Sequence, residues 1–389
     1  MSERKLVLVL SFLFLFSLLN PPQAAAPAPP QTEEHEPIII DGNNELLITA
    51  DVEGWNGTGS EGCPIVIKGL SITSETHGIY ISNVDLHFII EDCLITESET
   101  AANWCFGILL ENCSQASIER CTISNHEFGI CLLNSNGAIV NRTEVFDSFH
   151  GVYVNRSSNV WLISLDIVMC KVGISLNHTL YAHIAQTIVD HCEWYGIIGV
   201  GDSGTLLRHN TIIGSEVGVA FLVNGNWVLE ESVIFMCGVG LDAFDSDDGF
   251  VIRAWIKNCS ILGIALETTS HNISIIENWF GPNNTQNAQD DGAENIWFDE
   301  YCQMGNYWSD YSGEGPYLIP GSAGSVDLYP KSLEDAPDWE DAITTDDGSI
   351  TNGTTTGDDT FNEPVMLITA ASIVVILLVA VAMLRSRMS

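Results

Sequence analysis

Residues 129–154 read GICLLNSNGAIVNRTEVFDSFHGVYV, and this stretch contains one full period of a repeat that runs through most of the chain. A glycine is followed by an alternating apolar pair, Ile130 and Leu132, and the pattern starts again at Gly151. Alternation of this kind sends successive side chains to opposite faces of a strand. The stretch therefore predicts a short strand after each glycine.

The glycine recurs every 22 or 23 residues from Gly107 onward, after a first gap of 29. The row consists of Gly78, Gly107, Gly129, Gly151, Gly173, Gly196, Gly218, Gly240 and Gly263. A fixed period in this range is typical of a solenoid. No unit has a helical period, and such a length suits two or three strands of ~5 residues with turns. We predict an all-β fold, a single-stranded parallel β-helix over residues 38–295.

Small residues form a second column at the same spacing, which we expect at one corner of the coil. They are Asn125, Ser148, Cys170, Cys192, Ser215, Cys237 and Cys259. Such side chains can satisfy backbone groups of the next coil. The glycines are also expected at tight corners, where a side chain would clash or φ must be positive. A leucine-rich repeat would need a leucine–asparagine consensus that these units lack.

Both ends of the chain have the composition of targeting segments. Residues 1–26 combine a basic start, an apolar run and small residues, as in a secretion signal. Residues 364–384 are uncharged and long enough to cross ~30 Å of hydrocarbon as a helix. Because Arg385 and Arg387 follow, the tail 385–389 is predicted to be cytoplasmic. We expect a single-pass protein of the cell membrane with its β-helix outside.

Three further segments complete the predicted organisation. Residues 27–37 are a proline-rich linker, and residues 334–363 are an acidic stalk rich in Thr, Asp and Gly. Residues 296–333 are predicted to cap the last coil. In that cap Trp297, Tyr307, Trp308, Tyr311 and Tyr317 would cover the open end of the core.

The chain is strongly acidic, with 51 Asp and Glu against 13 Lys and Arg and a formal net charge of −38. Such a field repels phosphate, so we expect no nucleic-acid partner. Export permits N-glycosylation, and nine N-x-S/T sequons are present. They begin at Asn56, Asn112, Asn141, Asn155, Asn177, Asn258, Asn272, Asn283 and Asn352.

Eleven cysteines leave two interpretations open. Cys170 with Cys192, and Cys237 with Cys259, would lie one coil apart, within reach of a disulfide. The same column also holds serine, so we favour small buried thiols.

Residues 278–330 resemble the closing segment of a known family. The chain carries Asn278-Trp279-Phe280, then GNYWSDYSG at 305–313, and finally SVDLYP at 325–330. This is similar to NosD-type right-handed parallel β-helix proteins, and the coils from residue 64 onward resemble that family too. The resemblance implies a right-handed, pectate-lyase-like β-helix. The namesake member is linked to copper delivery. Many relatives carry an Asp/Gly-rich insertion before the Pro-Tyr, and here only 312–315 stand in its place.

Four aspartates form the best candidate metal site: Asp242, Asp245, Asp247 and Asp248. Asp202 and Asn224 are expected near the same corner in earlier coils. Calcium takes about six to eight oxygen ligands. The alternative is a solvated acidic turn. The sequence establishes no cofactor, and calcium is the ion that this cluster would suit.

Arg253 and Lys257 are the candidates for a catalytic base. A β-helix polysaccharide lyase needs calcium and an Arg or Lys, and both residues lie in the coil of the aspartate cluster. The alternative is an outward polar column, in which Glu231 beside Arg253 makes a cross-strand ion pair.

Copper binding would use soft ligands such as the Met169-Cys170 and Met236-Cys237 pairs. Neighbours on a strand point to opposite faces, and the two pairs lie three coils apart, ~14 Å. His178 and His183 would meet only if the turn between them folds back. The sequence therefore argues against copper.

The outward position two residues after each glycine is unusually apolar. Tyr80, Leu109, Tyr153 and Ile198 define a predicted binding strip for glycan or protein. The alternative is that the 94–106 insertion covers it.

The first functional hypothesis is therefore a membrane-anchored extracellular β-helix for surface display, which binds a glycan or a cell-envelope component without catalysis. The second is a calcium-dependent polysaccharide lyase or glycosidase. A periplasmic-type copper-binding protein is the third.

Overall fold

A computed structural model describes residues 32–98 and 105–336 of the 389-residue chain. Within those ranges no helix has the length and apolarity needed to cross a membrane. The predicted signal, membrane helix and cytoplasmic tail lie outside the described residues, as do residues 27–31 of the linker and most of the stalk. Asn352 also lies outside them.

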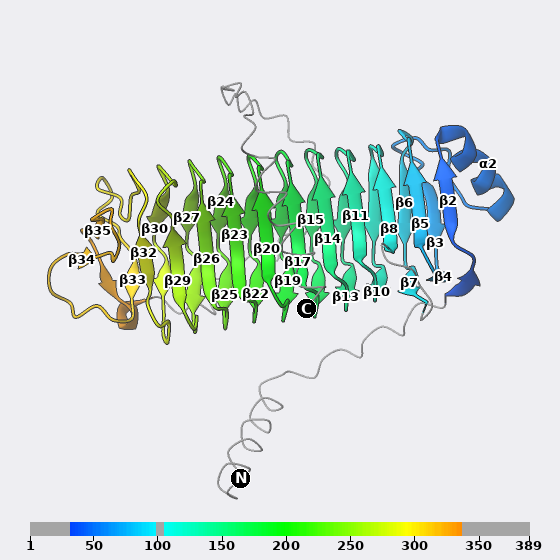
Figure 1. The fold of residues 1–389 in the computed structure, drawn as a ribbon. Coiled ribbons are helices and arrows are strands. Elements are labelled where there is room, and N and C mark those ends of the chain that lie inside the picture. Colours follow the sequence, from blue (N-terminus) through cyan, green and yellow to red (C-terminus); the bar gives the residue numbers. More distant parts are fainter. Residues whose placement is uncertain (1–31, 99–104, 337–389) are drawn as a thin grey trace, which may run out of the picture.

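The described chain winds into three parallel sheets, and its coils stack along one axis (Figure 1). The 13-stranded sheet contains β1 (Glu33–His35), β4 (Leu70–Ser74), β7 (Leu94–Glu97), β10 (Thr122–Ser124), β13 (Glu144–Phe146), β16 (Asp166–Val168), β19 (Ile188–Asp190), β22 (Thr211–Ile213), β25 (Val233–Phe235), β28 (Trp255–Lys257), β31 (Trp279–Phe280), β33 (Tyr307–Trp308) and β36 (Lys331–Ser332). The 11-stranded sheet contains β2 (Ile38–Asp41), β5 (His77–Ser82), β8 (Phe106–Glu111), β11 (Phe128–Leu133), β14 (His150–Asn155), β17 (Val172–Asn177), β20 (Tyr195–Val200), β23 (Val217–Leu222), β26 (Val239–Phe244), β29 (Leu262–Leu266) and β32 (Ala288–Asp290). The 10-stranded sheet contains β3 (Ile65–Lys68), β6 (Phe88–Glu91), β9 (Ala116–Glu119), β12 (Ile139–Asn141), β15 (Trp161–Ile163), β18 (His183–Ala185), β21 (Leu206–Arg208), β24 (Val228–Glu230), β27 (Phe250–Ile252) and β30 (Ser274–Ile276).

Each coil passes through the three sheets in the order 13-, 11- and 10-stranded, so the parallel β-helix prediction is confirmed. The alternating apolar residues point inward, and Ile130, Leu132, Val152 and Val154 are all fully buried. They belong to one continuous core that runs from Ile38 to Ile319.

The nine glycines form a vertical row, but they lie within strands and not at corners. Gly151, for example, is the second residue of β14, and none of the nine has a positive φ. A Cβ at Gly151 would lie 2.6 Å from the carbonyl oxygen of Gly173 and 2.6 Å from Cγ2 of Ile167. The position therefore needs glycine because the next coil and the neighbouring sheet leave no space. Of the two expected reasons, the clash is confirmed, whereas the positive φ and the corner location are not found.

The corners follow a different rule. At most of them, a residue in the left-handed conformation precedes a buried small residue, as in Met169 (φ 55°) before Cys170. The predicted corner column is confirmed from Ser148 to Cys259, but its first member is His126. Asn125 takes the left-handed position instead, with φ 64°. A one-residue shift of this kind exchanges an outward residue for an inward one.

Buried side-chain oxygens link successive coils at these corners. The backbone N–H of Ser135 donates to Ser157 Oγ at 2.9 Å, and the N–H of Asp202 donates to Asn224 Oδ1 at 2.8 Å. Each such bond satisfies an N–H that the strands leave unpaired. All eleven cysteines are free thiols, and nine of them are buried, which agrees with the favoured interpretation.

Both ends of the core are covered. The helix α2 (Asn43–Glu53) buries Leu46 and Ala50 at the N-terminal end (Figure 1). This helix was not predicted. The strands β34 (Tyr317–Leu318) and β35 (Val326–Asp327) pair at the other end, followed by the 3₁₀ turn η1 (Leu333–Asp335).

The C-terminal aromatic residues lie largely where they were predicted. Trp297 and Trp308 are fully buried, and Tyr317 stacks on Trp308 at 4.0 Å. Tyr311 packs against the same core. Tyr307 differs, because it faces outward and stacks on Trp279 at 5.6 Å.

We expect Gly151→Ala to lower the free energy of unfolding by about 3 kcal/mol, the upper part of the range for overpacked cores. The physical reason is the double clash with the Gly173 carbonyl and Ile167. Urea unfolding followed by circular dichroism measures the change. Gly225→Ala is the matched control, since nothing lies within 4 Å of its Cβ position. Equal stability of the two variants would contradict the clash.

Candidate functional site

The outer face of the 11-stranded sheet carries apolar side chains where a solvated face would carry polar ones. We call two of its columns the outer strip. One column stands immediately before the glycines: His77, Phe106, Phe128, His150, Val172, Tyr195, Val217, Val239 and Leu262. The other stands two residues after them: Tyr80, Leu109, Cys131, Tyr153, Ser175, Ile198, Ala220, Asp242 and Ala265. The predicted strip residues Tyr80, Leu109, Tyr153 and Ile198 all belong to it.

The N-terminal half of the outer strip is an aromatic ladder. The rings of Phe106 and Phe128 stack at 5.0 Å, and those of Phe128 and His150 also stack at 5.0 Å. Tyr153 meets Phe128 edge-on at 5.3 Å. Leu109 and Cys131 belong to the same cluster as these rings and are 6% and 2% exposed. This cluster is separate from the main core.

A second outer cluster follows in the next coils. Val172, Ile198 and Ala220 are buried there, with Trp194 and Tyr195 half-buried around them. Burial of His150 and of Tyr195 shifts both groups toward their neutral forms, lowering the pKa of His150 to about 4 and raising the pKa of Tyr195. The strip is therefore uncharged over most of its length at neutral pH.

Polar groups line one edge of the strip. The Tyr80 hydroxyl donates to Glu111 Oε2 at 2.8 Å, and Asn177 Nδ2 donates to the Tyr153 hydroxyl at 3.4 Å. Asn155 and Asn177 end successive strands on this edge and are half-buried. The combination of an apolar floor and a hydrogen-bonding edge suits a ligand that has both kinds of surface.

The predicted strip includes only the column that stands two residues after the glycines. The column before the glycines contributes Phe106, Phe128 and His150, which form the ladder. Strict alternation would place Phe128 on the same inward face as Ile130, so the pattern along the chain predicts the wrong side for this column. The strand register pairs Phe128 and Ile130 with the next coil but not Gly129 between them, and Phe128 lies in the outer cluster. Residues 99–104 of the predicted covering insertion lie outside the described ranges.

The four candidate calcium ligands do not come together. Asp242 projects from β26, whereas Asp245 and Asp248 take left-handed turn positions with φ 49° and 54°. Asp247 accepts from His271 Nδ1 at 2.9 Å, and Asp248 accepts from Asn272 Nδ2 at 2.7 Å. Across residues 32–98 and 105–336 no three His, Cys, Asp or Glu side chains are placed to hold a metal ion.

Asp202 and Asn224 lie inside the coil and not in the acidic turn. They are 2% and 3% exposed and belong to the corner ladder. Asp202 Oδ1 accepts the Thr179 N–H at 2.6 Å, while its Oδ2 is buried without a hydrogen-bond partner. Burial raises the pKa of this carboxyl to about 8. The expectation that it would join a calcium site is therefore corrected.

Arg253 and Lys257 have structural partners in two different places. Arg253 Nη2 pairs with Glu231 at 2.9 Å, as the alternative interpretation predicted. Lys257 projects from β28 and lies 3.4 Å from the ring centroid of Trp255. Asp242 lies on the 11-stranded sheet, so the structure does not bring these bases and that acid into one groove.

The soft-metal candidates are also separated. Met169 and Met236 are 64% and 56% exposed, whereas Cys170 and Cys237 are buried. His183 stacks on Trp161 at 4.0 Å on the outer face of β18, while His178 occupies a left-handed corner position. These residues do not fit a copper site.

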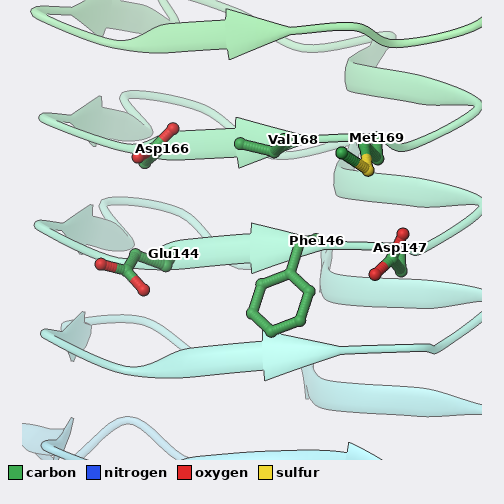
Figure 2. A pocket seen from close by; sticks show the side chains of 6 residues that line it. All are labelled: Glu144, Phe146, Asp147, Asp166, Val168 and Met169. Atoms are coloured by element: carbon green, nitrogen blue, oxygen red, sulfur yellow. The ribbon is translucent and has the colours of Figure 1, made fainter. Parts of the chain in front are cut away.

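One shallow hollow of about 270 Å³ lies on the 13-stranded sheet. Figure 2 shows Glu144 and Asp166 on neighbouring strands, with Asp147 and Met169 at the corner beside them. Burial, and secondarily the charge of Asp190, raises the pKa of Asp166. The hollow is acidic and open, and it brings no base to these carboxylates.

Three sequons coincide with the structural repeat. Asn141, Asn155 and Asn177 each end a strand, and the Ser or Thr two residues later is fully buried at the corner. Thr143 Oγ1, for instance, accepts the Cys121 N–H at 3.3 Å. The fold thus accounts for the Ser or Thr of these tripeptides whether or not the Asn is glycosylated. Asn56, Asn112, Asn272 and Asn283 are exposed, and Asn258 is half-buried.

Comparison with known proteins identifies one matching family. Residues 38–199 and 129–313 match the sequence profile described as "Periplasmic copper-binding protein (NosD)". Together these matches cover well over half of the chain. No curated protein matches the sequence.

Several solved structures have a similar course of the chain. A variant of the periplasmic alginate epimerase AlgG is 13% identical with a TM-score of 0.47, and the match covers 77% of this chain and 84% of that one. The Azotobacter vinelandii mannuronan C-5 epimerase AlgE6 A-module is 9% identical with a TM-score of 0.38, covering 76% and 94%. The enzymatically active domain of bacteriophage CBA120 tailspike protein 2 is 12% identical with a TM-score of 0.43, covering 67% and 47%. Likenesses this distant carry no argument about function.

We expect Asp202→Asn to stabilise the protein at pH 8, on the order of a few kcal/mol. The native pKa of Asp202 is raised to about 8, so its contribution to stability is full below about pH 4 and is lost as the pH rises through 8. Thermal unfolding of both proteins from pH 4 to 9 tests this. The two curves should converge near pH 4, and a constant difference across the range would refute the assignment.

Thr143→Ala should cost about 1–2 kcal/mol, because it leaves the buried Cys121 N–H without an acceptor. Asn141→Gln removes the same sequon and leaves the corner intact, so it should be near neutral. Urea unfolding of protein made in a host without N-glycosylation compares the two. If Asn141→Gln were the more damaging change, the structural role of Thr143 would be wrong.

Proposed function

The chain belongs to the NosD family of β-helix proteins, and on that premise we propose that it is a membrane-anchored surface protein whose outer strip binds a glycan of the cell envelope. The apolar, aromatic outer face of the 11-stranded sheet is the observation that supports the proposal. The anchor in this proposal is the apolar stretch 364–384, with the β-helix outside the cell and the tail 385–389 in the cytoplasm.

The fold itself does not require an apolar outer face. The inward residues already form a continuous core, so outward aromatic rings add nothing to the closure of the coil. Large apolar patches on an outer face usually mark binding sites, and the part of this one that a ligand can reach includes the half-buried Tyr80, Phe106 and Tyr153. An apolar floor beside Glu111, Asn155 and Asn177 matches the chemistry of sugars, which have apolar ring faces and hydroxyl rims.

The copper in the family description is not carried over to this chain. No three His, Cys, Asp or Glu side chains of the described residues are placed to hold a metal ion, and Met169 and Met236 are exposed whereas the cysteines that follow them are buried. A lyase is not favoured either, because Arg253 and Lys257 are separated from Asp242 by a sheet boundary. Binding therefore agrees better with the described residues than either reaction does.

A polysaccharide array tests the proposal with the full chain in detergent or nanodiscs. We expect Tyr80→Ala and Tyr153→Ala each to weaken glycan binding about tenfold, which corresponds to about 1.4 kcal/mol. Trp161→Ala is the matched control, since this ring is 41% exposed on the 10-stranded sheet, outside the strip. The readout covers both binding and cleavage, with and without calcium. Absence of glycan binding, or an equal loss in the control, would refute the proposal.

A further inference from the structure

Asp242 is the one carboxylate of the outer strip. Every other member of the two columns is apolar, aromatic, histidine or serine. The carboxyl projects from β26 between Ala220 of β23 and Ala265 of β29, its partners in register. Both neighbours are alanine, whereas Tyr80, Leu109 and Tyr153 fill the same column in earlier coils. The side chains on each side of Asp242 are therefore shorter than those in the N-terminal coils of the strip.

The carboxyl of Asp242 is held in an environment that does not satisfy it. Its Oδ1 atom is buried and has no hydrogen-bond partner among the described residues. A buried acceptor without a partner is costly, so this carboxyl is held at a cost in stability. Burial, reinforced by the charge of Glu267, raises the pKa of Asp242 to about 6.

The charges that surround Asp242 are all acidic. Glu267 acts on its carboxyl, and Asp242 and Glu216 both act on the Tyr195 hydroxyl. No Lys, Arg or His in the described ranges forms an ion pair with Asp242, Glu216 or Glu267. This part of the strip therefore repels anions and offers only acceptors to a ligand.

We propose that the outer strip selects uncharged glycans and that Asp242 is the specificity-determining residue, which accepts hydrogen bonds from sugar hydroxyls. The inference rests on the proposed glycan binding and adds the class of sugar. A neutral sugar brings hydroxyl donors to the half-buried carboxyl of Asp242, and its apolar ring face lies against the half-buried ring of Tyr195 beside it. A uronate or sulfated sugar would bring its charge next to Asp242 and Glu267, in a partly desolvated place where repulsion is strong.

The test measures affinities of the full chain for two neutral polysaccharides, a β-glucan and a mannan, and two anionic ones, alginate and polygalacturonate. Wild type should bind a neutral polymer at least tenfold more tightly than either anionic one. Asp242→Ala should lose at least tenfold in neutral-glycan affinity. Asp242→Asn keeps an acceptor without the charge, so it should retain most of that affinity. It should also reduce the difference in affinity between the neutral polymers and the uronates.

Two controls separate a role in recognition from a role in folding. Asp166→Ala removes a carboxyl on the 13-stranded sheet, whose pKa is also raised, and should leave binding unchanged. Thermal unfolding establishes that each variant is folded.

The outcomes distinguish this inference from the proposed function. If glycans bind and Tyr153→Ala weakens binding but Asp242→Ala does not, the strip binds glycan and the role of Asp242 is wrong. Preferential binding of alginate or polygalacturonate would overturn the selection for uncharged sugars alone. If none of the four polymers binds, both proposals fail.

Discussion

The backbone hydrogen bonds that join each coil to the next are the constraint on which the rest of the structure depends. They fix the spacing between coils, and side chains must then fit the space that remains. At the glycine row no space remains, because the carbonyl oxygen of Gly173 lies where a Cβ on Gly151 would be. The register of the whole rod is thus tied to the residue that has no side chain.

The same constraint explains features that at first look functional. Most corners combine a residue in the left-handed conformation with a small buried residue, and at several of them that residue accepts an N–H from the preceding coil. Met169 before Cys170 follows this pattern, which separates the two sulfur atoms. Arg142 before Thr143 follows it as well, so the Thr of the Asn141 sequon has a structural role without any glycan. A periodic fold therefore generates apparent motifs through its own repetition.

The outer strip is different because repetition does not require it. Inward positions must be apolar for the coil to close, whereas outward positions are free to vary. On the 10-stranded sheet they include charged groups such as Arg208 and Glu230 that pair across strands. On the 11-stranded sheet they are aromatic and apolar through many coils, with Asp242 near one end. That contrast between two faces of one rod is why the binding function is assigned to the 11-stranded sheet.

The sequence by itself determined the period, the strand after each glycine and the parallel coil, because these depend only on spacing and alternation along the chain. It also determined that Glu231 and Arg253 pair, since residues one period apart become neighbours. Tertiary structure alone decided which polar residues are buried. His126 replaces Asn125 at a corner, and Asp202 lies in the core while Asp245 lies in solvent. A shift of one residue at a turn moves a side chain from the inside of the coil to its outside. Because the gaps in this repeat are either 22 or 23 residues, the spacing along the chain does not decide which of two neighbouring residues faces inward.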